Sequence, residues 1–287
     1  MPLAYQFWKG ADFPMHTQEK VVDLPEERKR PVDYKPQIPR TQPEIVIKDL
    51  VKKFGNVQAV NGLNLHIHKG EMFGFLGPNG AGKTTTISML CGLLAPSSGS
   101  AQIAGFDIRQ QPRQVKERIG VCPQEAAVFK FLTGMENLEL FGNLYGMDKK
   151  ILRERVGELV NQADFADAAR RKAKGYSGGM MRQLNLMIAL ISDPEIVFLD
   201  EPTVGMDARA RRRTWQQIGA LKEQGKTVIL TTHYIEEAQS LSDRVGIIDY
   251  GELIALGTPD ELMAQHDAAD LEAVFLEITG RRIMEGL

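Results

Sequence analysis

The segment GPNGAGKT, at residues 77–84, has the residue types and spacing of a loop that binds phosphate. It matches the pattern GxxxxGK followed by Ser or Thr, and it lies between a short apolar run and a segment with helical character, where that pattern functions. Lys83 is placed to reach the β- and γ-phosphates of a nucleotide, Thr84 to ligate Mg²⁺, and Thr85 to contact a further phosphate oxygen. The residues expected to bring backbone N–H groups to the phosphates are Gly77, Asn79, Gly80 and Gly82.

Two carboxylates end a second apolar run, IVFLDEP at 196–202. At the end of a strand in an open α/β sheet, Asp200 and Glu201 would lie at the edge where such sheets bind their ligands. Asp200 suits the outer shell of Mg²⁺, through bound waters. Glu201 points elsewhere, because strand side chains alternate, and suits a general base that takes a proton from an attacking water. The simpler alternative is a carboxylate pair that closes a strand.

His233 ends a third apolar run, TVILTTH at 227–233. A histidine at the end of a strand is by itself more often structural. At a sheet edge that also carries phosphates and a metal, a contact with the γ-phosphate is the better interpretation. We therefore expect His233 to act in catalysis with Glu201.

The elements that must position these residues predict an α/β protein with a mostly parallel sheet. EIVIKDL alternates as a strand does, and a turn at Gly55-Asn56 leads to a second strand through LNLHIH. MFGFL, IVFLD, TVILTT and RVGIID are short apolar runs separated by helical segments. Residues 134–175 are mostly helical, and Thr133 with Glu136 fits a capping box. We predict a P-loop NTPase core with flanking helices, antiparallel strands near its N-terminal end, and a helical insertion.

The sequence suggests three parts. Residues 1–43 contain several prolines and no sustained periodicity, which predicts an extended or loosely ordered arm. Residues 44–260 form the nucleotide-binding domain, with a helical subdomain at about 126–180. Residues 261–287 form a helical tail.

Composition narrows the functional classes. The net charge of −2 argues against general attraction to nucleic acid. Cys91 and Cys122 lie in apolar surroundings without a second Cys or His at metal-ligand spacing, so we expect buried thiols in a reducing compartment. No apolar run approaches the roughly 18 residues that a membrane helix needs. We expect a cytoplasmic protein whose membrane role requires a partner.

Three further motifs follow in order: Gln124 in VCPQE, YSGGM at 176–180, and Asp207 in GMD. With the phosphate loop, the carboxylate pair and His233, this succession closely resembles the ATP-binding subunit of ATP-binding cassette (ABC) transporters, over about residues 44–260. The resemblance implies a subunit that binds ATP and Mg²⁺ and dimerises around ATP with an identical or related copy. Hydrolysis would then drive a separate membrane-spanning subunit, which holds the chain at the cytoplasmic face of the membrane.

The resemblance also implies roles for individual residues. Phe54, in KKFGNV, occupies the place of the aromatic that stacks on adenine; a core aromatic beside a turn is the alternative. Gln124 would contact the region of Mg²⁺ and the attacking water and respond to the membrane subunit. Asp207 would lie at the dimer seam. The residues expected to bind the γ-phosphate of nucleotide held by the other copy are Ser177, Gly178 and Gly179.

The YSGGM segment departs from the usual family pattern, which commonly begins with Leu and ends with Gln; here Tyr176 and Met180 stand instead. Such variants are similar to those of drug- and antibiotic-resistance exporters and related natural-product or lipid exporters, and so is the ending DLEAVFLEITG. The alternative is a soluble ABC ATPase acting on the ribosome or nucleic acid. Its only support is basic clusters at 170–174 and 209–213, which are better explained as solvated helix faces, so no nucleic acid is expected.

Overall fold

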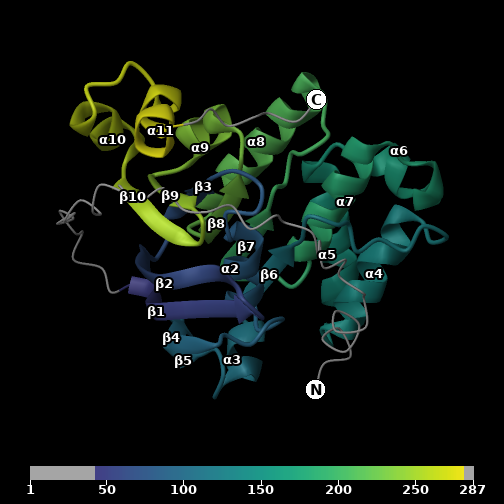
Figure 1. Ribbon diagram of the computed structural model, residues 1–287. Coiled ribbons are helices and arrows are strands. Elements are labelled where there is room, and N and C mark those ends of the chain that lie inside the picture. The colour runs from purple at the N-terminus through teal and green to yellow at the C-terminus, as the bar shows by residue number, and fades with distance from the viewer. Residues whose placement is uncertain (1–42, 281–287) are drawn as a thin grey trace. The chain divides into compact units, whose positions relative to one another are not determined.

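The computed structural model describes residues 43–280, which fall into two compact units (Figure 1). We call residues 116–230 the helical unit, and residues 43–115 together with 231–280 the phosphate-loop unit. The predicted arm at 1–43 and the end of the predicted tail lie almost entirely outside the described residues. Each unit is described by itself below.

The phosphate-loop unit contains an antiparallel sheet with the strand order β2-β1-β4-β5. Its strands are β1 (Pro43–Phe54), β2 (Val57–His68), β4 (Ser98–Ile103) and β5 (Phe106–Asp107). Alternate residues of β1, such as Ile45 and Ile47, are buried, as the sequence pattern predicts. The β1–β2 hairpin turns at Gly55, whose φ of 55° favours glycine. The antiparallel strands predicted near the beginning of the core are confirmed.

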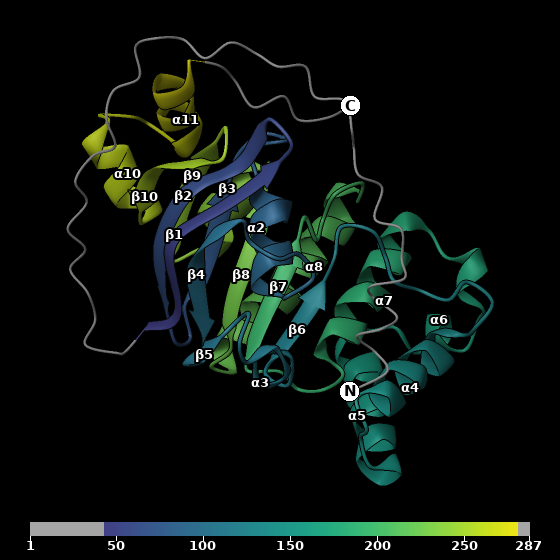
Figure 2. The ribbon, with the colours of Figure 1, turned by 60° about the horizontal axis from the view of Figure 1, so that its bottom comes forward.

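The same unit holds a second group of strands and the C-terminal helices. The strands are β3 (Met72–Leu76), β9 (Arg244–Asp249) and β10 (Glu252–Gly257); the helices are α2 (Lys83–Leu90), α9 (Ile235–Leu241), α10 (Pro259–Gln265) and α11 (Leu271–Thr279). Strand β3 pairs with β9 in parallel and β10 pairs with β9 antiparallel. Helices α10 and α11 lie side by side (Figures 1 and 2), and Leu271 and Phe275 of α11 pack with Val245 and Ile247 of β9.

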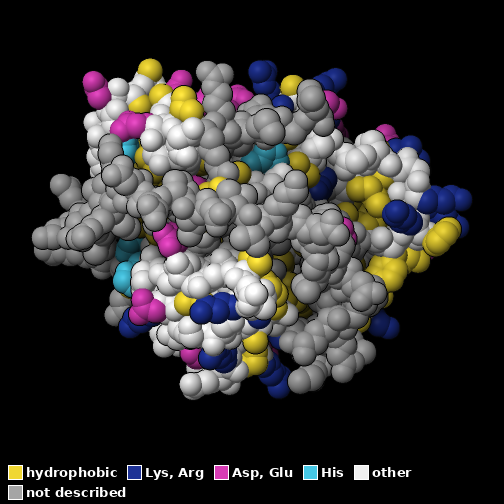
Figure 3. Space-filling view, viewed as in Figure 1, with side chains coloured by type: hydrophobic (Ala, Val, Ile, Leu, Met, Phe, Trp, Pro, Cys, Tyr) yellow, Lys and Arg dark blue, Asp and Glu magenta, His cyan; other side chains and the backbone are white. Residues whose placement is uncertain are grey.

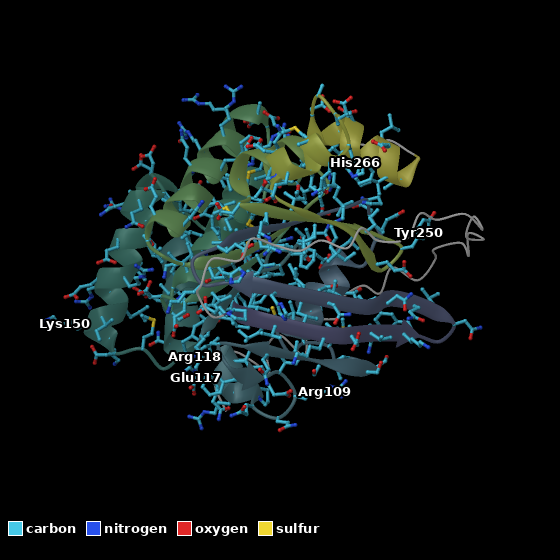
Figure 4. All side chains as sticks on the ribbon, turned by 90° about the vertical axis from the view of Figure 1, so that its left-hand side faces the viewer. Arg109, Glu117, Arg118, Lys150, Tyr250 and His266 are labelled. Carbon is cyan, nitrogen blue, oxygen red and sulfur yellow. The ribbon has the colours of Figure 1, made fainter. Side chains whose placement is uncertain are left out.

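The turn between β9 and β10 carries Tyr250, and the end of α10 carries His266 (Figure 4). The Nδ1 atom of His266 lies 3.2 Å from the Glu277 carboxylate of α11. The two C-terminal helices are thus joined by a polar contact as well as by the apolar cluster below them.

The helical unit contains a parallel pair of strands, β6 (Ile119–Cys122) and β7 (Ile196–Asp200). Between them in the chain come α4 (Gly134–Leu144), α5 (Lys149–Gln162), α6 (Ala166–Ala169), a 3₁₀ turn η1 (Ala173–Gly175) and α7 (Gly178–Leu190); α8 (Ala208–Glu223) follows β7. Two elements, α3 (Pro112–Lys116) and β8 (Thr227–Thr232), run through the division between the units. The predicted capping box is confirmed, since the side chains of Thr133 and Glu136 each accept from the other's backbone N–H.

These elements confirm the predicted α/β class with its helical insertion. Cys91 and Cys122 are buried free thiols, as expected. Among residues 43–280, no helix combines the length and apolar character needed to cross a membrane.

A charged junction ties three segments of the helical unit together at Asp193, in the loop between α7 and β7. Lys226 Nζ, whose side chain is only 10% exposed, donates to Asp193 Oδ1 and to the Pro194 carbonyl, both at 2.8 Å. Arg155 of α5 donates to Asp193 Oδ1 and to the Leu190 carbonyl, both at 3.2 Å. The hydrogen bond from Lys226, aided by the charges of Lys226 and Arg155, outweighs partial burial and lowers the pKa of Asp193.

This junction predicts a pH-dependent coupling. Because the folded-state pKa of Asp193 is lowered, its stabilisation is present above the ordinary Asp value of 3.8 and is lost as the pH falls through the lowered value. A double-mutant cycle with Asp193→Asn and Lys226→Met measures how much the two side chains together contribute to the free energy of unfolding. We expect about 0.5–1 kcal/mol at pH 7, since the Asp193 carboxylate is largely solvated. Urea unfolding at pH 7 and at a series of pH values below 4 measures it.

Glu158→Gln is the matched control, because Glu158 also pairs with Arg155 and is about as exposed as Asp193, but its pair lies within one helix, at i and i+3; a change of only a few tenths of a kcal/mol is expected. A coupling that keeps its full size at pH 3 would contradict this account of the junction.

Candidate functional site

The phosphate loop, residues 77–84, contains glycines at positions where a side chain would collide with neighbouring backbone. Gly80 and Gly82 have φ values of 82° and 103°, which L-residues with a side chain rarely adopt. A Cβ on Gly82 would lie 2.3 Å from the Ala59 carbonyl of β2, and one on Gly77 would lie 2.3 Å from the Ile248 carbonyl of β9. The two glycines therefore let the loop pack against β2 and β9 while its own backbone stays accessible to a ligand.

Lys83 places a buried ammonium group inside this loop. Its Nζ donates to the carbonyls of Gly77 and Pro78 at 2.7 and 3.0 Å. Thr86, one turn into α2, anchors the helix start by donating its hydroxyl to the Gly82 carbonyl at 2.9 Å. The outer side of the loop is open, since the exposed residues there are Asn79, Gly80 and Thr84, with Thr85 half-buried. A positive charge beneath an exposed helix N-terminus is suited to bind a phosphate.

His233 belongs to the same unit and follows β8 directly. The Gly77 N–H donates to the Thr232 carbonyl at 3.3 Å, so the end of β8 is bonded to the first residue of the phosphate loop. The backbone N–H of Gly77 is thus hydrogen-bonded to the end of β8, although the sequence suggested that this N–H faces a phosphate. The His233 ring is buried and packs on the Tyr234 ring with 4.3 Å between centroids. The structure therefore brings His233 and the phosphate loop together.

Phe54 ends β1 and is half-buried, which leaves part of its ring accessible. Lys52 Nζ lies 5.0 Å from the centre of that ring and donates to the Ala95 carbonyl at 2.8 Å. A cation over the ring is attractive and orients it. Lys52 was not singled out from the sequence; its spacing of two residues from Phe54 on one strand is the signal that could have identified it.

In the helical unit, Asp200 and Glu201 are both buried at the end of β7. Glu201 has a φ of 47°, a left-handed conformation that is costly for a residue with a long side chain. Gln124, which follows β6, donates its Nε2 to Glu201 Oε2 at 3.3 Å. The parallel pairing of β6 and β7 brings the two residues together although they are 77 positions apart in sequence.

The YSGGM segment forms the start of α7. Ser177 is its N-cap, and the Ser177 hydroxyl accepts from the Met180 N–H at 3.3 Å. The helix begins at Gly178, so both glycines belong to its first turn. Ser177 and Gly178 are exposed and Gly179 is half-buried. This helix N-terminus therefore presents a hydroxyl and unencumbered backbone to an anion.

Tyr176 fixes the segment to the rest of the helical unit. Its hydroxyl lies 2.6 Å from the Ala168 carbonyl and 3.2 Å from the Arg171 carbonyl, as a donor to both. Its ring packs edge-on against Phe165 with 5.5 Å between centroids. Partial burial raises the pKa of Tyr176. The departure from leucine noted in the sequence thus supplies a polar anchor.

Asp207 is the N-cap of α8, where its Oδ1 accepts from the Ala210 N–H at 2.8 Å. Its side chain is exposed, and the basic cluster that follows it in α8 is exposed or half-buried, as a solvated helix face would be. Asp207 therefore caps α8 in the structure. Its place at a dimer seam stays a prediction.

Comparison with known proteins gives a consistent result. Residues 60–204 match the family model described as ABC transporter. The chain is 42% identical over 233 residues to a daunorubicin resistance ATP-binding protein of Streptomyces coeruleorubidus, covering 81% of this chain and 74% of that protein. It is 46% identical over 224 residues to the daunorubicin/doxorubicin resistance ATP-binding protein of Streptomyces peucetius, covering 77% and 68%.

Two solved structures share the fold. One, described as the ATP-binding subunit of an ABC transporter, has a TM-score of 0.75 at 26% identity and covers 82% of this chain and 99% of its own. The other is a dimeric ATP-binding cassette in a post-hydrolysis state with ADP and Pi, with a TM-score of 0.69 at 27% identity, covering 75% and 98%. The chain therefore belongs to the ABC transporter family, as one of its ATP-binding and ATP-hydrolysing subunits.

Proposed function

We propose that two copies of this chain, or this chain and a related one, bind ATP between them and use its hydrolysis to power export through a membrane-spanning subunit. The observation that carries the catalytic part is the pairing of the Gln124 amide with the buried Glu201 carboxylate. An amide donor holds this carboxylate in place without giving it a proton, so the carboxylate can accept a proton from a water molecule. Glu201 is thus the general base for attack on the γ-phosphate.

The phosphate loop and Lys83 would bind the phosphates, and Phe54 would stack on the adenine. Mg²⁺ prefers hard oxygen ligands and keeps part of its water shell, which suits the Thr84 hydroxyl and the Asp200 carboxylate as its protein contacts, with Gln124 beside them. The ion would neutralise charge that develops on the phosphates. His233, bonded through its neighbour to the phosphate loop, would contact the γ-phosphate.

The start of α7 supplies the second side of the site. It carries a hydroxyl, a glycine backbone and a helix dipole, but no group able to act as acid or base, so it can bind an anion without reacting with it. We propose that Ser177, Gly178 and Gly179 bind the γ-phosphate of ATP held by the other copy, with Asp207 at the seam. ATP binding would then join the copies and hydrolysis would release them.

The transported molecule is proposed from the relatives. Both relatives described above are named for resistance to daunorubicin, a drug. We propose that the exporter carries drug-like, natural-product or lipid molecules and that the chain lies on the cytoplasmic face of the membrane.

An exposed aromatic side chain is the proposed contact with the membrane subunit. Phe131, which lies between Gln124 and α4, is 77% exposed. Figure 3 shows hydrophobic side chains beside Lys and Arg over the helices of the helical unit. A large apolar side chain in water, seven residues from a catalytic group, fits a surface that a partner covers.

Glu201→Gln tests the catalytic proposal. Loss of the general base should lower kcat at least about 100-fold, while ATP with Mg²⁺ still produces a dimer, because the phosphate contacts remain. ATPase assays and size-exclusion chromatography with light scattering measure both. Glu195→Gln, next to the same strand but exposed, should change neither. A Glu201→Gln variant that remains monomeric with ATP and Mg²⁺ would count against the ATP-joined dimer.

Mixed dimers test whether Ser177 acts on the partner's nucleotide. Ser177→Asp keeps a good N-cap but places a negative charge against the phosphate, whereas Ser177→Asn keeps the cap without the charge. A dimer of one Ser177→Asp copy with one Lys83→Ala copy has one intact site only if Ser177 acts across the dimer. It should retain about half of the wild-type ATPase activity, as two equal sites require, and each pure mutant dimer almost none. An inactive mixed dimer would refute action across the dimer; Ser177→Asn should stay the more active of the two cap variants.

Phe131→Ser tests the membrane contact. The substitution removes the apolar surface without touching the nucleotide residues, so the isolated subunit should keep its basal ATPase activity and lose co-purification with the membrane subunit. Ile151 of α5 is also an exposed apolar residue, at 58%, so Ile151→Ser is the matched control and should still co-purify with the membrane subunit. Equal co-purification of both variants would place the contact elsewhere.

A further inference from the structure

Asn185 is a polar residue in the most buried part of α7. Only 1% of its surface is exposed, and its neighbours along the helix, Leu184 and Leu186, are buried apolar residues. An amide in such a place is costly unless every polar atom is paired. The presence of Asn185 at this position therefore indicates that its amide has specific hydrogen-bond partners.

Those contacts go to one loop and to Cys122, the strand residue before it. Asn185 Oδ1 accepts from the Ala127 N–H at 3.2 Å, and Nδ2 donates to the Pro123 carbonyl at 3.0 Å. Nδ2 also lies 3.3 Å from the Sγ of Cys122, whose pKa burial raises to about 12, so that the sulfur remains a neutral thiol. We call residues 123–127 the glutamine loop, because Gln124 lies inside it. One side chain thus pairs with both ends of this loop.

Arg182 reinforces the same connection. It lies three residues before Asn185, hence on the same side of α7, and its Nη1 donates to the Pro123 carbonyl at 3.2 Å. The carbonyl that accepts both bonds belongs to the residue immediately before Gln124. A movement of α7 along its axis would therefore move the backbone that carries Gln124.

We propose that Asn185 is a positioning residue for hydrolysis, which holds the glutamine loop so that the Gln124 amide stays on Glu201 and links this contact to the position of α7. The proposal rests on the function proposed above. Since Ser177 caps the N-terminus of α7, engagement of that end by the other copy would reach Gln124 through one rigid helix and two polar side chains. Catalysis would thereby depend on whether α7 is engaged.

A second buried asparagine shows that the arrangement is specific. Asn137 of α4 is fully buried, accepts from the Phe129 N–H at 2.8 Å, and donates to the carbonyls of Phe129 and Thr133 at 3.1 and 2.8 Å. Its amide makes three hydrogen bonds to backbone groups, against two for Asn185, and all three lie in the segment after the glutamine loop. Asn137→Ala therefore removes an equivalent buried amide without touching the residues beside Gln124.

The test compares Asn185→Ala with Asn137→Ala in the isolated subunit. Asn185→Ala should lower kcat about 10- to 100-fold through misplacement of Gln124, with KM for ATP and ATP-driven dimerisation in the Glu201→Gln background unchanged. Asn137→Ala should lower the melting temperature by a similar amount but keep kcat. Asn185→Leu, which fills the same volume without polar atoms, gives a second measurement should the alanine variant fold poorly.

A double-mutant cycle separates positioning from a general structural role. If Asn185 acts through Gln124, adding Asn185→Ala to Gln124→Ala should cost no further activity, whereas independent structural damage would multiply the losses. Multiplying losses, or an Asn185→Ala variant with wild-type kcat, would overturn this inference alone. A wild-type chain without ATPase activity would overturn the proposed function and this inference together.

Discussion

A loop that holds phosphate through its backbone must keep side chains out of the space between that backbone and its neighbours. Gly77 and Gly82 meet this requirement, since a Cβ on either would collide with a carbonyl of β9 or β2. Other features of the phosphate-loop unit follow from it. The Gly251 N–H of the β9–β10 turn donates to the Ala81 carbonyl at 3.0 Å, and the Gly251 carbonyl accepts from the Asn61 N–H at 2.8 Å. Strand β2, this turn and the end of β8 thus support the loop from several sides.

The helical unit holds a buried carboxylate next to the amide of an exposed residue. Glu201 receives an amide donor from Gln124, and Gln124 in turn depends on backbone held by α7. Tyr176 fixes the other end of the same helix through carbonyls near α6. Helix α7, which is capped by Ser177, the proposed phosphate ligand, therefore also carries the side chains that hold the backbone next to Gln124.

The sequence predicts those features whose cause is local. The glycine-rich loop, the capping box at Thr133 and the apolar strands are encoded in consecutive residues, and the structure contains all of them. The start of α7 at Gly178 is harder to predict, because glycines are poor helix formers and the cap at Ser177 outweighs that preference. The contacts of Gln124, Asn185, Tyr176 and Asp193 join segments that tertiary packing alone brings together. No pattern in one chain specifies them, although an isolated Asn within the apolar run LNLMIALI is a signal that could have been followed.

Glu201 carries a cost that its neighbours do not. Its left-handed backbone is disfavoured by about 1–2 kcal/mol for a residue with a Cβ, and glycine or asparagine would relieve that strain. As the proposed general base, Glu201 would be retained for activity at the expense of stability. Selection for heat resistance alone would favour substitution of Glu201. The resulting chain would be more stable than its ancestor but would lack the proposed base for ATP hydrolysis. Such idle copies could still occupy a place in a dimer, so a thermostabilised subunit of this type should be judged by its turnover and not by its melting temperature.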